Sequence, residues 1–404
     1  MSERCMAIIS YHSCPLGRLG GRDTGGMNVY VREVARELGA QGYAVDIYTR
    51  AHDLQEPPVM SLFEKTRLIH IRAGWVGDMG KAEQFRHLAE FVRNVTDFVS
   101  TDGVSYDLIH SHYWLSGLAG QRLSETWGVP QIMMFHTLGV VKNDLPVGER
   151  ESEVRLKAER DLARACRHIV VATEDEWGQI GTWGVGAEKV SVVPCGVDLE
   201  LFRPTDKLAA RRELGLAGEE EIILSVGRIE PLKGLERLVE AFSILHRPGL
   251  KLLIVGGDTH SHNETARLKA LAVGLGVGDR LEFYGAMAQE RLSLYYNAAD
   301  VTVVASYYES FCLIILESLA CGTPVVSTGV GVAPAVIDDT CGMVAEGTPQ
   351  SLAQAIARVL DRGQVYEAEH LRRTAAPYSW TAVAERLAKV YQAVLVPGSH
   401  KSAV

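Results

Sequence analysis

Cysteine is one of the scarcer residues of this chain and follows no recognisable spacing. The seven cysteines are scattered through 404 residues, odd in number and without a CxxC pair. These features argue against a disulfide framework and against a zinc site held by cysteines. Long apolar runs are absent too: none reaches the ~18 residues of a membrane span, and MSERCMAIISYHS holds too short an apolar run for a secretory signal. We therefore expect a cytoplasmic globular protein.

The sequence also has no excess of positive charge. Its 41 basic residues are outnumbered by 50 acidic ones, which gives a formal net charge of -9. Nucleic acids and anionic membrane surfaces are bound by basic faces, so we expect neither as a partner. A local basic pocket for a small phosphorylated ligand is still compatible with this balance. At about 100–200 residues per domain, the length predicts two or three domains.

Short apolar stretches alternate with helical patterns through the first half. The stretch Cys5 to Ser10 leads to the glycine-rich LGRLGGRDTGG, and a helix is predicted from Asn28 to Leu38, where apolar residues recur at spacings of three and four. Further strands are predicted at Leu68–Ile71, Ala44–Tyr48, Leu108–His110, Gln131–Phe135 and Ile169–Ala172. This alternation predicts an α/β fold with a parallel sheet covered by helices on both faces.

The second half repeats the alternation after a polar interruption. After Val190–Pro194 the pattern turns polar in DLELFRPTDKLAARRELGL, whose proline and charged run are typical of an interdomain linker. We then predict strands at Glu221–Val226, Leu252–Val255, Leu281–Tyr284, Val301–Ala305 and Pro324–Ser327, and helices at Leu235–His246, Glu264–Gly274, Gln289–Ala298 and Phe311–Ala320. The prediction is two doubly wound domains, residues 1–198 and 199–404, facing each other across a cleft. The last helix, Thr381–Val394, could pack back on the first domain.

A glycine pair lies between the first strand and the first helix. Gly25 and Gly26 would let the backbone approach a bound sugar or phosphate, next to the free N–H groups of a helix start. A tight turn in an ordinary α/β protein is an equally good explanation. The fingerprint GxGxxG is absent from this loop, which argues against a nicotinamide enzyme.

Two cations follow a strand of the second half. Arg228 and Lys233, in VGRIEPLKG, come after Glu221–Val226 and before the next helix. Ligands of open α/β sheets bind at the carboxyl ends of strands, and the guanidinium fork with the point charge of the ammonium suits a pyrophosphate. A solvated basic turn is the alternative, and the position on the sheet favours binding.

Two glutamates flank the next helix in YYESFCLIILES. Glu309 and Glu317 are eight residues apart, a little over two helical turns, so they are better suited to gripping separate hydroxyl groups than to sharing a proton. The free amides of Ser310, Phe311, Cys312 and Leu313 would seat a diphosphate at the helix N-terminus. Helix capping would explain Glu309 alone but not the pair.

Three histidines, His110, His112 and His136, lie near strand ends of the first half. The first two are spaced like metal ligands on a strand, but no third ligand follows in pattern, so a metal site is disfavoured. His110 could equally be satisfied within the core. His136 closes the strand Gln131–Phe135, which places it where a ligand would lie.

Taken together, these segments resemble the retaining glycosyltransferases of family 4. The resemblance covers nearly the whole chain and rests on HSCPLGRLGGRDTGGMNVYVREVARELG, YDLIHSHYWLSG, FHTLGVVKN, VVPCGVD, VGRIEPLKG and YYESFCLIILES in combination. It implies the GT-B fold, two facing Rossmann-like domains, and transfer of a hexosyl group from a UDP-sugar, which is a substrate and not a cofactor. Within the family, the chain resembles most the members that transfer N-acetylglucosamine to inositol phosphate, and after them the sucrose-phosphate synthases.

The resemblance assigns roles residue by residue. His136, Arg228, Lys233 and Glu309 would be the catalytic set, with His136 contacting the donor sugar. The donor would be bound by Gly25, Gly26, Arg228, Lys233, Glu309, Ser310, Phe311, Cys312, Leu313 and Glu317. The phosphorylated acceptor would be bound by Asn28, Lys81, Tyr113, Thr137 and Arg155. No metal site is implied, because the cations and helix amides suffice to stabilise the leaving diphosphate.

The chain departs from the family pattern at three positions. Cys312 stands where Glu-Ser-Phe-Gly has glycine, Cys195 where proline is frequent, and Val332 where glycine often is. Other functions therefore stay open: a sugar-nucleotide-binding protein without turnover, or an epimerase, which the acceptor-phosphate residues argue against. A lipid acceptor is disfavoured by the acidic balance and by the lack of a clear basic amphipathic helix. A homodimer is compatible with the sequence.

Overall fold

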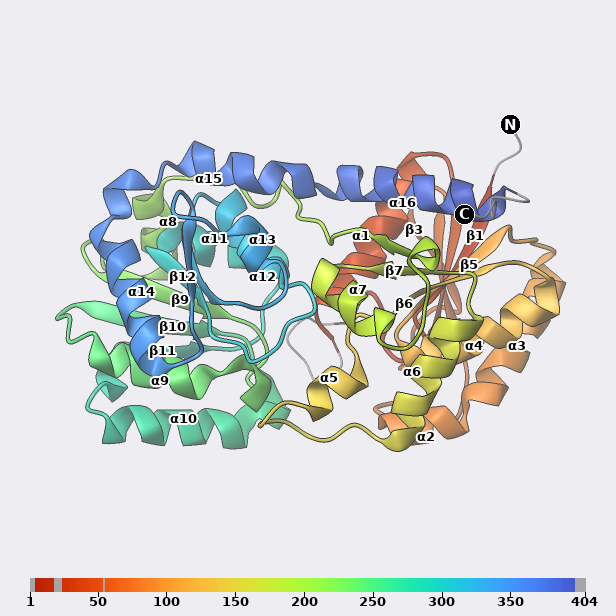
Figure 1. The fold of residues 1–404 in the computed structure, drawn as a ribbon, viewed down its shortest axis with the longest axis horizontal. Coiled ribbons are helices and arrows are strands. Elements are labelled where there is room, and N and C mark those ends of the chain that lie inside the picture. The colour runs from red at the N-terminus through yellow and green to blue at the C-terminus, as the bar shows by residue number, and fades with distance from the viewer. Residues whose placement is uncertain (1–3, 18–23, 54, 397–404) are drawn as a thin grey trace.

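The chain folds into two lobes, each built on its own β-sheet. The computed structural model describes residues 4–17, 24–53 and 55–396. One sheet lies in the right lobe of Figure 1 and the other in the left lobe, with helices around both. The expectation of two parallel α/β domains is confirmed.

The first sheet has the order β3-β4-β2-β1-β5-β6-β7-β8. Its pairings are parallel except that of β3 with β4. The strands are β1 (Cys5–Ile9), β2 (Ala44–Arg50), β3 (Val59–Phe63), β4 (Thr66–Ile71), β5 (Leu108–His112), β6 (Gln131–Met134), β7 (His168–Val171) and β8 (Val190–Val192). The order changes direction at β1, so a crevice opens between the ends of β1 and β5.

The second sheet is parallel throughout and has the order β11-β10-β9-β12-β13-β14. Its strands are β9 (Glu221–Val226), β10 (Leu250–Val255), β11 (Leu281–Tyr284), β12 (Val301–Val304), β13 (Val325–Thr328) and β14 (Gly342–Ala345). Numbered from β9, this is the Rossmann order 3-2-1-4-5-6, and its crevice lies between β9 and β12.

Helices cover both sheets. Those of the first lobe are α1 (Gly26–Ala40), α2 (Lys81–Arg86), α3 (Leu88–Asp102), α4 (Trp114–Trp127), α5 (Gly139–Asn143), α6 (Glu153–Ala165) and α7 (Glu174–Gly181). The remaining helices are α8 (Lys207–Leu214), α9 (Leu235–Ile244), α10 (His262–Gly274), α11 (Gln289–Ala298), α12 (Leu313–Ala320), α13 (Ala333–Val336), α14 (Pro349–Asp361), α15 (Ala368–Ala375) and α16 (Trp380–Leu395). Because both faces of each sheet are covered, the central strands β1, β5, β9 and β12 are almost wholly buried.

The stretch predicted as a linker is only partly one. Its second half forms α8, which begins at an Asp206 cap that accepts a hydrogen bond from the Ala209 amide at 2.7 Å. The buried Arg211 of α8 donates to the Ala298 carbonyl at 2.9 Å and to Asp300 Oδ2 at 2.7 Å. The charged run therefore ties α8 to the second lobe, so this half of the stretch is not a linker.

The last helix contacts the first lobe. In Figure 1, α16 runs along the top of the molecule from the side of α15 over the first lobe. Thr381 Oγ1 donates to Glu37 Oε2 of α1 at 2.9 Å, and Tyr391 Oη lies 2.8 Å from His110 Nδ1 on β5. The C-terminal helix thus joins the two lobes on the side of β5.

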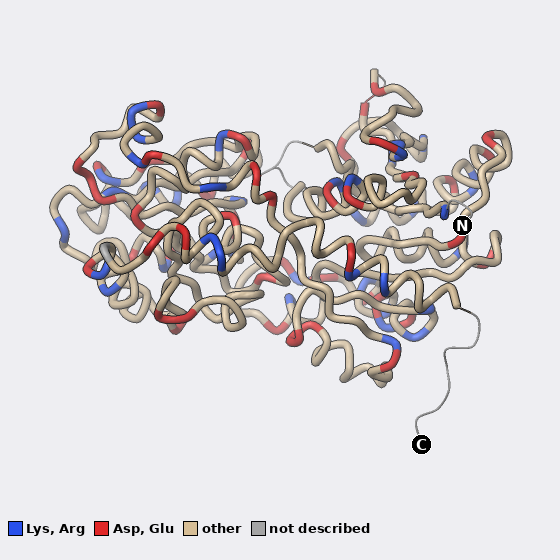
Figure 2. The backbone as a smooth tube through the Cα atoms, turned by 90° about the horizontal axis from the view of Figure 1, so that it is seen from above, with Lys and Arg blue, Asp and Glu red and all other residues tan. Residues whose placement is uncertain are grey.

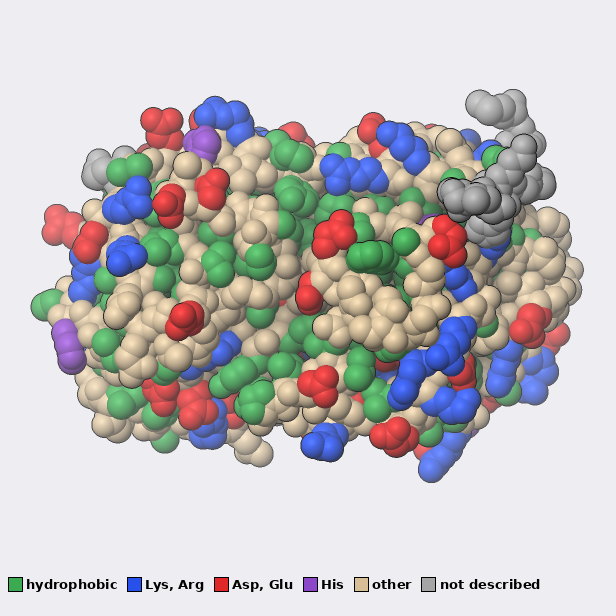
Figure 3. All heavy atoms as spheres, in the orientation of Figure 1, with side chains coloured by type: hydrophobic (Ala, Val, Ile, Leu, Met, Phe, Trp, Pro, Cys, Tyr) green, Lys and Arg blue, Asp and Glu red, His purple; other side chains and the backbone are tan. Residues whose placement is uncertain are grey.

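Charges of both signs are interspersed on the surface. Lys and Arg alternate with Asp and Glu along the chain on both lobes (Figure 2), and the face in Figure 3 shows the same mixture. Within the described ranges, no helix is both long and apolar enough to cross a membrane.

Candidate active site

A cavity of about 330 Å³ lies between the two lobes. It opens beside the carboxyl ends of β5 and β9, where ligands of doubly wound sheets bind. All residues predicted for the donor and acceptor sites line this one cavity, although they come from many separate segments of the chain. Residues 18–23 of the glycine-rich stretch lie outside the described residues. The predicted residues therefore lie together around one cavity. The roles assigned to them remain predictions.

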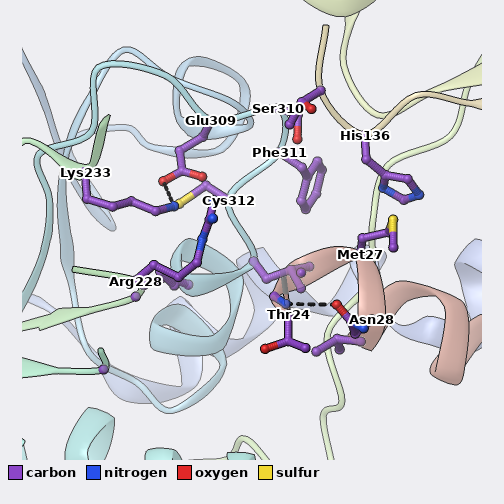
Figure 4. A pocket seen from close by; sticks show the side chains of 18 of the residues that line it. Thr24, Met27, Asn28, His136, Arg228, Lys233, Glu309, Ser310, Phe311 and Cys312 are labelled. Atoms are coloured by element: carbon purple, nitrogen blue, oxygen red, sulfur yellow. Dashed lines mark hydrogen bonds and ion pairs between the residues drawn. The ribbon is translucent and has the colours of Figure 1, made fainter. Parts of the chain in front are cut away.

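On the second lobe, a lysine and a glutamate form an ion pair at the cavity wall. Lys233 Nζ lies 2.6 Å from Glu309 Oε1, and both side chains are less than one-fifth exposed. Ser306 Oγ donates to the same carboxylate oxygen at 2.7 Å. Arg228 lies on the same side of the cavity (Figure 4) and contacts Glu230 at 2.8 Å. The two predicted diphosphate ligands therefore approach the cavity from one wall.

Helix α12 begins at Leu313, two residues later than predicted. Cys312 precedes it in a left-handed conformation with φ +77°, so the helix cannot extend back to Phe311. The unbonded amides at the helix start are those of the first turn, while Ser310 and Phe311 belong to the preceding loop. The predicted seat at Ser310 and Phe311 is corrected to a loop leading into the helix.

Cys312 occupies a backbone position that suits glycine. A left-handed conformation costs an L-residue about 1–2 kcal/mol, which explains why glycine would be easier here. The Cys312 side chain is buried, and burial raises the pKa of its thiol well above the ordinary value of 9.0. The thiol is therefore neutral at neutral pH, and Cys312 is among the residues that line the cavity. Val332 has an ordinary φ of -80° and shows no such strain.

The second glutamate, Glu317, has partners of its own. Its carboxylate accepts from Tyr296 Oη at 2.7 Å and from Gln289 Nε2 at 3.3 Å. Burial raises the pKa of Glu317. The two glutamates therefore line the cavity as separate acceptors, as their spacing predicts.

Opposite this wall, α1 begins at the glycine pair. Asn28 accepts from the Gly25 amide at 2.9 Å and donates to Cys14 O and Ser13 Oγ, both at 2.7 Å. A side chain built on Gly25 would meet no atom within 4 Å, so protein packing does not explain this glycine. Gly25 lines the cavity, so the open space beside it is available to a ligand.

Three of the predicted acceptor residues form one hydrogen-bonded cluster. Arg155 donates to Tyr113 Oη at 3.0 Å and to both Thr137 O and Thr137 Oγ1 at 2.9 Å. Lys81 Nζ lies 5.7 Å from the centre of the Tyr113 ring. Glu151, which sequence reasoning missed, bridges Arg155 at 2.7 Å and Lys142.

The three histidines lie side by side, with His136 at the cavity. His136 Nε2 lies 2.9 Å from His112 Nδ1, and the rings of His112 and His110 are 4.2 Å apart. Burial lowers the pKa of His136 to about 3, so the imidazole in the cavity is neutral at neutral pH. The disfavoured metal reading of His110 and His112 finds no support, because His110 bonds to Tyr391 as a core histidine does.

Burial of these imidazoles should make the folded state weaker in acid. His110 and His112 are fully buried, which lowers the pKa of His110 to about 3 and that of His112 well below the ordinary 6.5. Below pH 6.5 the unfolded chain gains protons that the folded chain does not. The contribution of these histidines to the free energy of unfolding is therefore fully present above pH 6.5 and is lost as the pH decreases. Between about pH 7.5 and about pH 5.5, we expect each histidine to lower the free energy of unfolding by about 1 kcal/mol.

Urea unfolding at the two pH values measures this loss. His110→Gln should reduce the difference, because one titrating group is removed. His262→Asn is the matched control: it removes an exposed histidine that contacts the Thr259 carbonyl oxygen, and the difference between the two pH values should remain. An equal urea midpoint at both pH values in the unmodified protein would contradict the buried neutral state.

Sequence reasoning missed the backbone strain around the cavity. Among the described residues, five non-glycine residues have positive φ, and three of them, Tyr113, His136 and Cys312, line the cavity. Such conformations cluster at functional sites. His12 was missed as well: it follows β1 by three residues, is buried, and its ring lies 4.2 Å from Tyr113. Its place after the first strand was the available signal.

Family models match both lobes. Residues 25–196 match a glycosyl transferase 4-like domain, and residues 206–391 match the glycosyl transferases group 1. D-inositol 3-phosphate glycosyltransferase of Mycobacteroides abscessus is 39% identical over 97% of this chain and 89% of its own length. The enzyme of that name from Geodermatophilus obscurus is 40% identical over 96% of this chain and 89% of its own length.

Solved structures agree with these sequence matches. Sucrose-phosphate synthase from Thermosynechococcus elongatus superposes with a TM-score of 0.90 at 33% identity, over 96% of this chain and 98% of its own. The Anabaena protein HepE, solved with UDP and glucose, has a TM-score of 0.76 at 18% identity, over 97% and 100% of the two chains, and supports the fold alone. The chain belongs to the GT-B glycosyltransferases. Its first lobe matches the glycosyl transferase 4-like domain, and its second lobe matches the glycosyl transferases group 1.

Proposed function

We propose that the protein is a retaining hexosyltransferase that moves a sugar from a UDP-sugar to a phosphorylated cyclitol or sugar. N-acetylglucosaminyl transfer to an inositol phosphate is favoured, in line with the names of the relatives at 39–40% identity. The observation that carries the proposal is a single cavity with cations at two places. One set, Arg228 and Lys233, lies on the second lobe and the other, around Arg155, on the first.

The second lobe would bind the donor. Arg228, Lys233 and the amides at the start of α12 would neutralise the diphosphate as the glycosidic bond breaks. Glu309 would hold hydroxyls of the sugar, and Glu317, which accepts from Tyr296, would hold the ribose. The space beside Gly25 supports a close approach of a ligand to the backbone, because no protein atom lies within 4 Å of a Cβ built there.

The first lobe would bind the acceptor phosphate. Arg155 already directs its guanidinium to Tyr113 and Thr137. Lys81 and Lys142 line the same end of the cavity, and Asn28 lies at the start of α1 between the two lobes. Cations and hydroxyls in this arrangement complement a phosphate.

No side chain needs to act as the catalytic base. Glu309 is paired with Lys233, and His136 is neutral with a pKa of about 3. In front-face transfer, the glycosidic bond to the donor phosphate breaks while the acceptor oxygen bonds to the same carbon. The leaving phosphate oxygen takes the acceptor proton. Protein groups then orient both substrates and stabilise the leaving group.

A product assay tests this function. UDP-glucose and UDP-N-acetylglucosamine are each combined with inositol 3-phosphate, fructose 6-phosphate and the unphosphorylated forms, and products are identified by mass spectrometry. The proposal expects N-acetylglucosaminyl inositol phosphate and no product without the acceptor phosphate. Sucrose phosphate as product would establish the alternative favoured by the 0.90 TM-score. Binding of UDP without any product would contradict the enzyme and indicate a sugar-nucleotide-binding protein.

Glu151 gives a finer prediction about the acceptor. Its carboxylate lies 2.7 Å from Arg155 and also pairs with Lys142. It therefore occupies both cations with a negative charge that competes with the acceptor phosphate. Glu151→Gln should lower the KM for the phosphorylated acceptor several-fold and leave the donor KM unchanged, because a competing negative charge is removed. Steady-state kinetics with each substrate varied provide the measurement. A raised acceptor KM would mean that Glu151 positions the cations.

A further inference from the structure

A cysteine, a histidine and a glutamate lie close together outside the cavity, in the first lobe. Cys14 follows β1, His70 is on β4, and Glu56 belongs to the segment between β2 and β3. The Cys14 Sγ lies 3.8 Å from His70 Nε2, which lies 3.9 Å from Glu56 Oε2. One ligand atom from each residue falls within 4.8 Å of the others, and Cys14 and His70 are buried. None of the three lines the cavity described above.

Hydrogen bonding orients the His70 ring toward the other two groups. His70 Nδ1 lies 2.8 Å from the Pro57 carbonyl oxygen, which can only accept, so Nδ1 carries the proton and donates. Nε2 is therefore the ring nitrogen that faces Cys14 and Glu56. A histidine that binds a metal through one nitrogen commonly donates its other N–H to a backbone carbonyl in this way.

Glu56 is fixed by backbone donors. Its Oε2 accepts from the amides of His52 at 3.1 Å and of Asp53 at 3.2 Å. The carboxylate is thus held beside His70 by the turn that contains it, without a lysine or arginine partner among the ion pairs described for it. Its side chain remains 30% exposed, which leaves a route from solvent to the three groups.

We propose that Cys14, Glu56 and His70 bind a divalent transition-metal ion, with Zn²⁺ the best match to this donor set. Thiolate, imidazole and carboxylate are the common protein ligands of zinc. Tetrahedral zinc with bonds of about 2.3 Å to sulfur and about 2.0 Å to nitrogen places those two atoms about 3.5 Å apart. The observed 3.8 Å needs a shift of only a few tenths of an ångström. Solvent supplies the fourth ligand on the exposed side of Glu56.

The ion would stabilise the start of the glycine-rich loop. Cys14 is joined through its carbonyl to Asn28 Nδ2 at 2.7 Å, and Asn28 holds the Gly25 amide at the cavity. Burial raises the pKa of the free Cys14 thiol to about 11, so binding must release the thiol proton to solvent. The site is separate from the sugar-transfer chemistry, which needs no metal in the proposal above.

Metal content of the purified full chain tests the site directly. After incubation with zinc and gel filtration, elemental analysis should find about one zinc ion per chain, and roughly tenfold less in Cys14→Ser, His70→Gln and Glu56→Gln. Cys166→Ser is the matched control, because Cys166 is also a buried thiol of the first lobe but lies in no such group. It should retain zinc. A content below a tenth in the unmodified protein, or an equal content in Cys14→Ser, would overturn the proposal.

Cobalt provides a readout that needs no destabilised variant. Co²⁺ added to the unmodified protein should produce the charge-transfer absorption of a thiolate–cobalt bond, and zinc should displace it. The absorption should persist in Cys166→Ser and disappear in Glu56→Gln or weaken strongly. If Co²⁺ binds without a thiolate band, Cys14 is not a ligand and the proposal fails, whatever the sugar-transfer assay shows.

Discussion

Lys233→Ala should reduce kcat/KM for sugar transfer by about 10²–10³-fold, the size expected when one preorganised charge at a developing anion is removed. Lys233 Nζ is held 2.6 Å from Glu309 at the cavity wall, so the ammonium is oriented before the donor arrives. The leaving diphosphate gains negative charge as the glycosidic bond breaks, and a mostly buried cation stabilises that charge more strongly than water does. The measurement is kcat/KM with each substrate varied.

The fold should survive this change. Lys233 belongs to a short turn after β9, and Glu309, which loses its partner, lines the cavity and still accepts from Ser306 Oγ, so the urea midpoint should fall less than in Arg155→Ala. Lys251→Ala is the matched control: Lys251 is ion-paired with Glu220 and Glu282 but does not line the cavity, and its loss should not affect turnover. Unchanged kinetics in Lys233→Ala would remove Lys233 from the catalytic set.

The fold could be predicted largely from local patterns. The strands Glu221–Val226 and Leu281–Tyr284 and the helix Gln289–Ala298 have the predicted bounds, because apolar periodicity and flanking turns mark them without tertiary information. β3 and β14 were not predicted: β3 is a half-exposed edge strand, and β14 is four residues long and begins with glycine. A short strand of this kind is defined by its neighbour in the sheet, which the sequence does not display.

The site was predictable where it depends on strand ends. Arg228 is predicted at the cavity because it follows β9, whereas Tyr113 and Arg155 were predicted only through the family resemblance. What the patterns did not reveal was conformation: Cys312 has a positive φ, and α12 begins two residues later than predicted. Nor did they reveal that Arg155 is a buried residue, since arginine in a charged helix usually faces solvent.

That burial gives Arg155→Ala a large expected effect on stability. Arg155 is 1% exposed and lies 2.6 Å from Glu159, which is wholly buried. Removing one member of a buried ion pair leaves the other charge without compensation, at a cost of about 3–5 kcal/mol in the free energy of unfolding. Urea unfolding measures this cost, and Lys157→Ala, which breaks an exposed pair on the same helix, should cost less than about 1 kcal/mol. Equal costs would mean that Glu159 is neutral in the folded protein.

The same burial means that Arg155→Ala alone cannot show whether Arg155 binds a phosphate. The double variant Arg155→Met/Glu159→Gln separates the two roles, because it leaves no buried charge unpaired. The carboxamide oxygen introduced by Glu159→Gln can still accept from the Gly139 amide, which now lies 2.8 Å from Glu159 Oε2. Much of the lost stability should therefore return in the double variant. The KM for the phosphorylated acceptor should nevertheless stay at least about tenfold raised while the donor KM stays normal, since a charge-assisted hydrogen bond to phosphate is absent. If stability and acceptor KM recover together, Arg155 supports the helix and the phosphate is bound by other cations of the cluster.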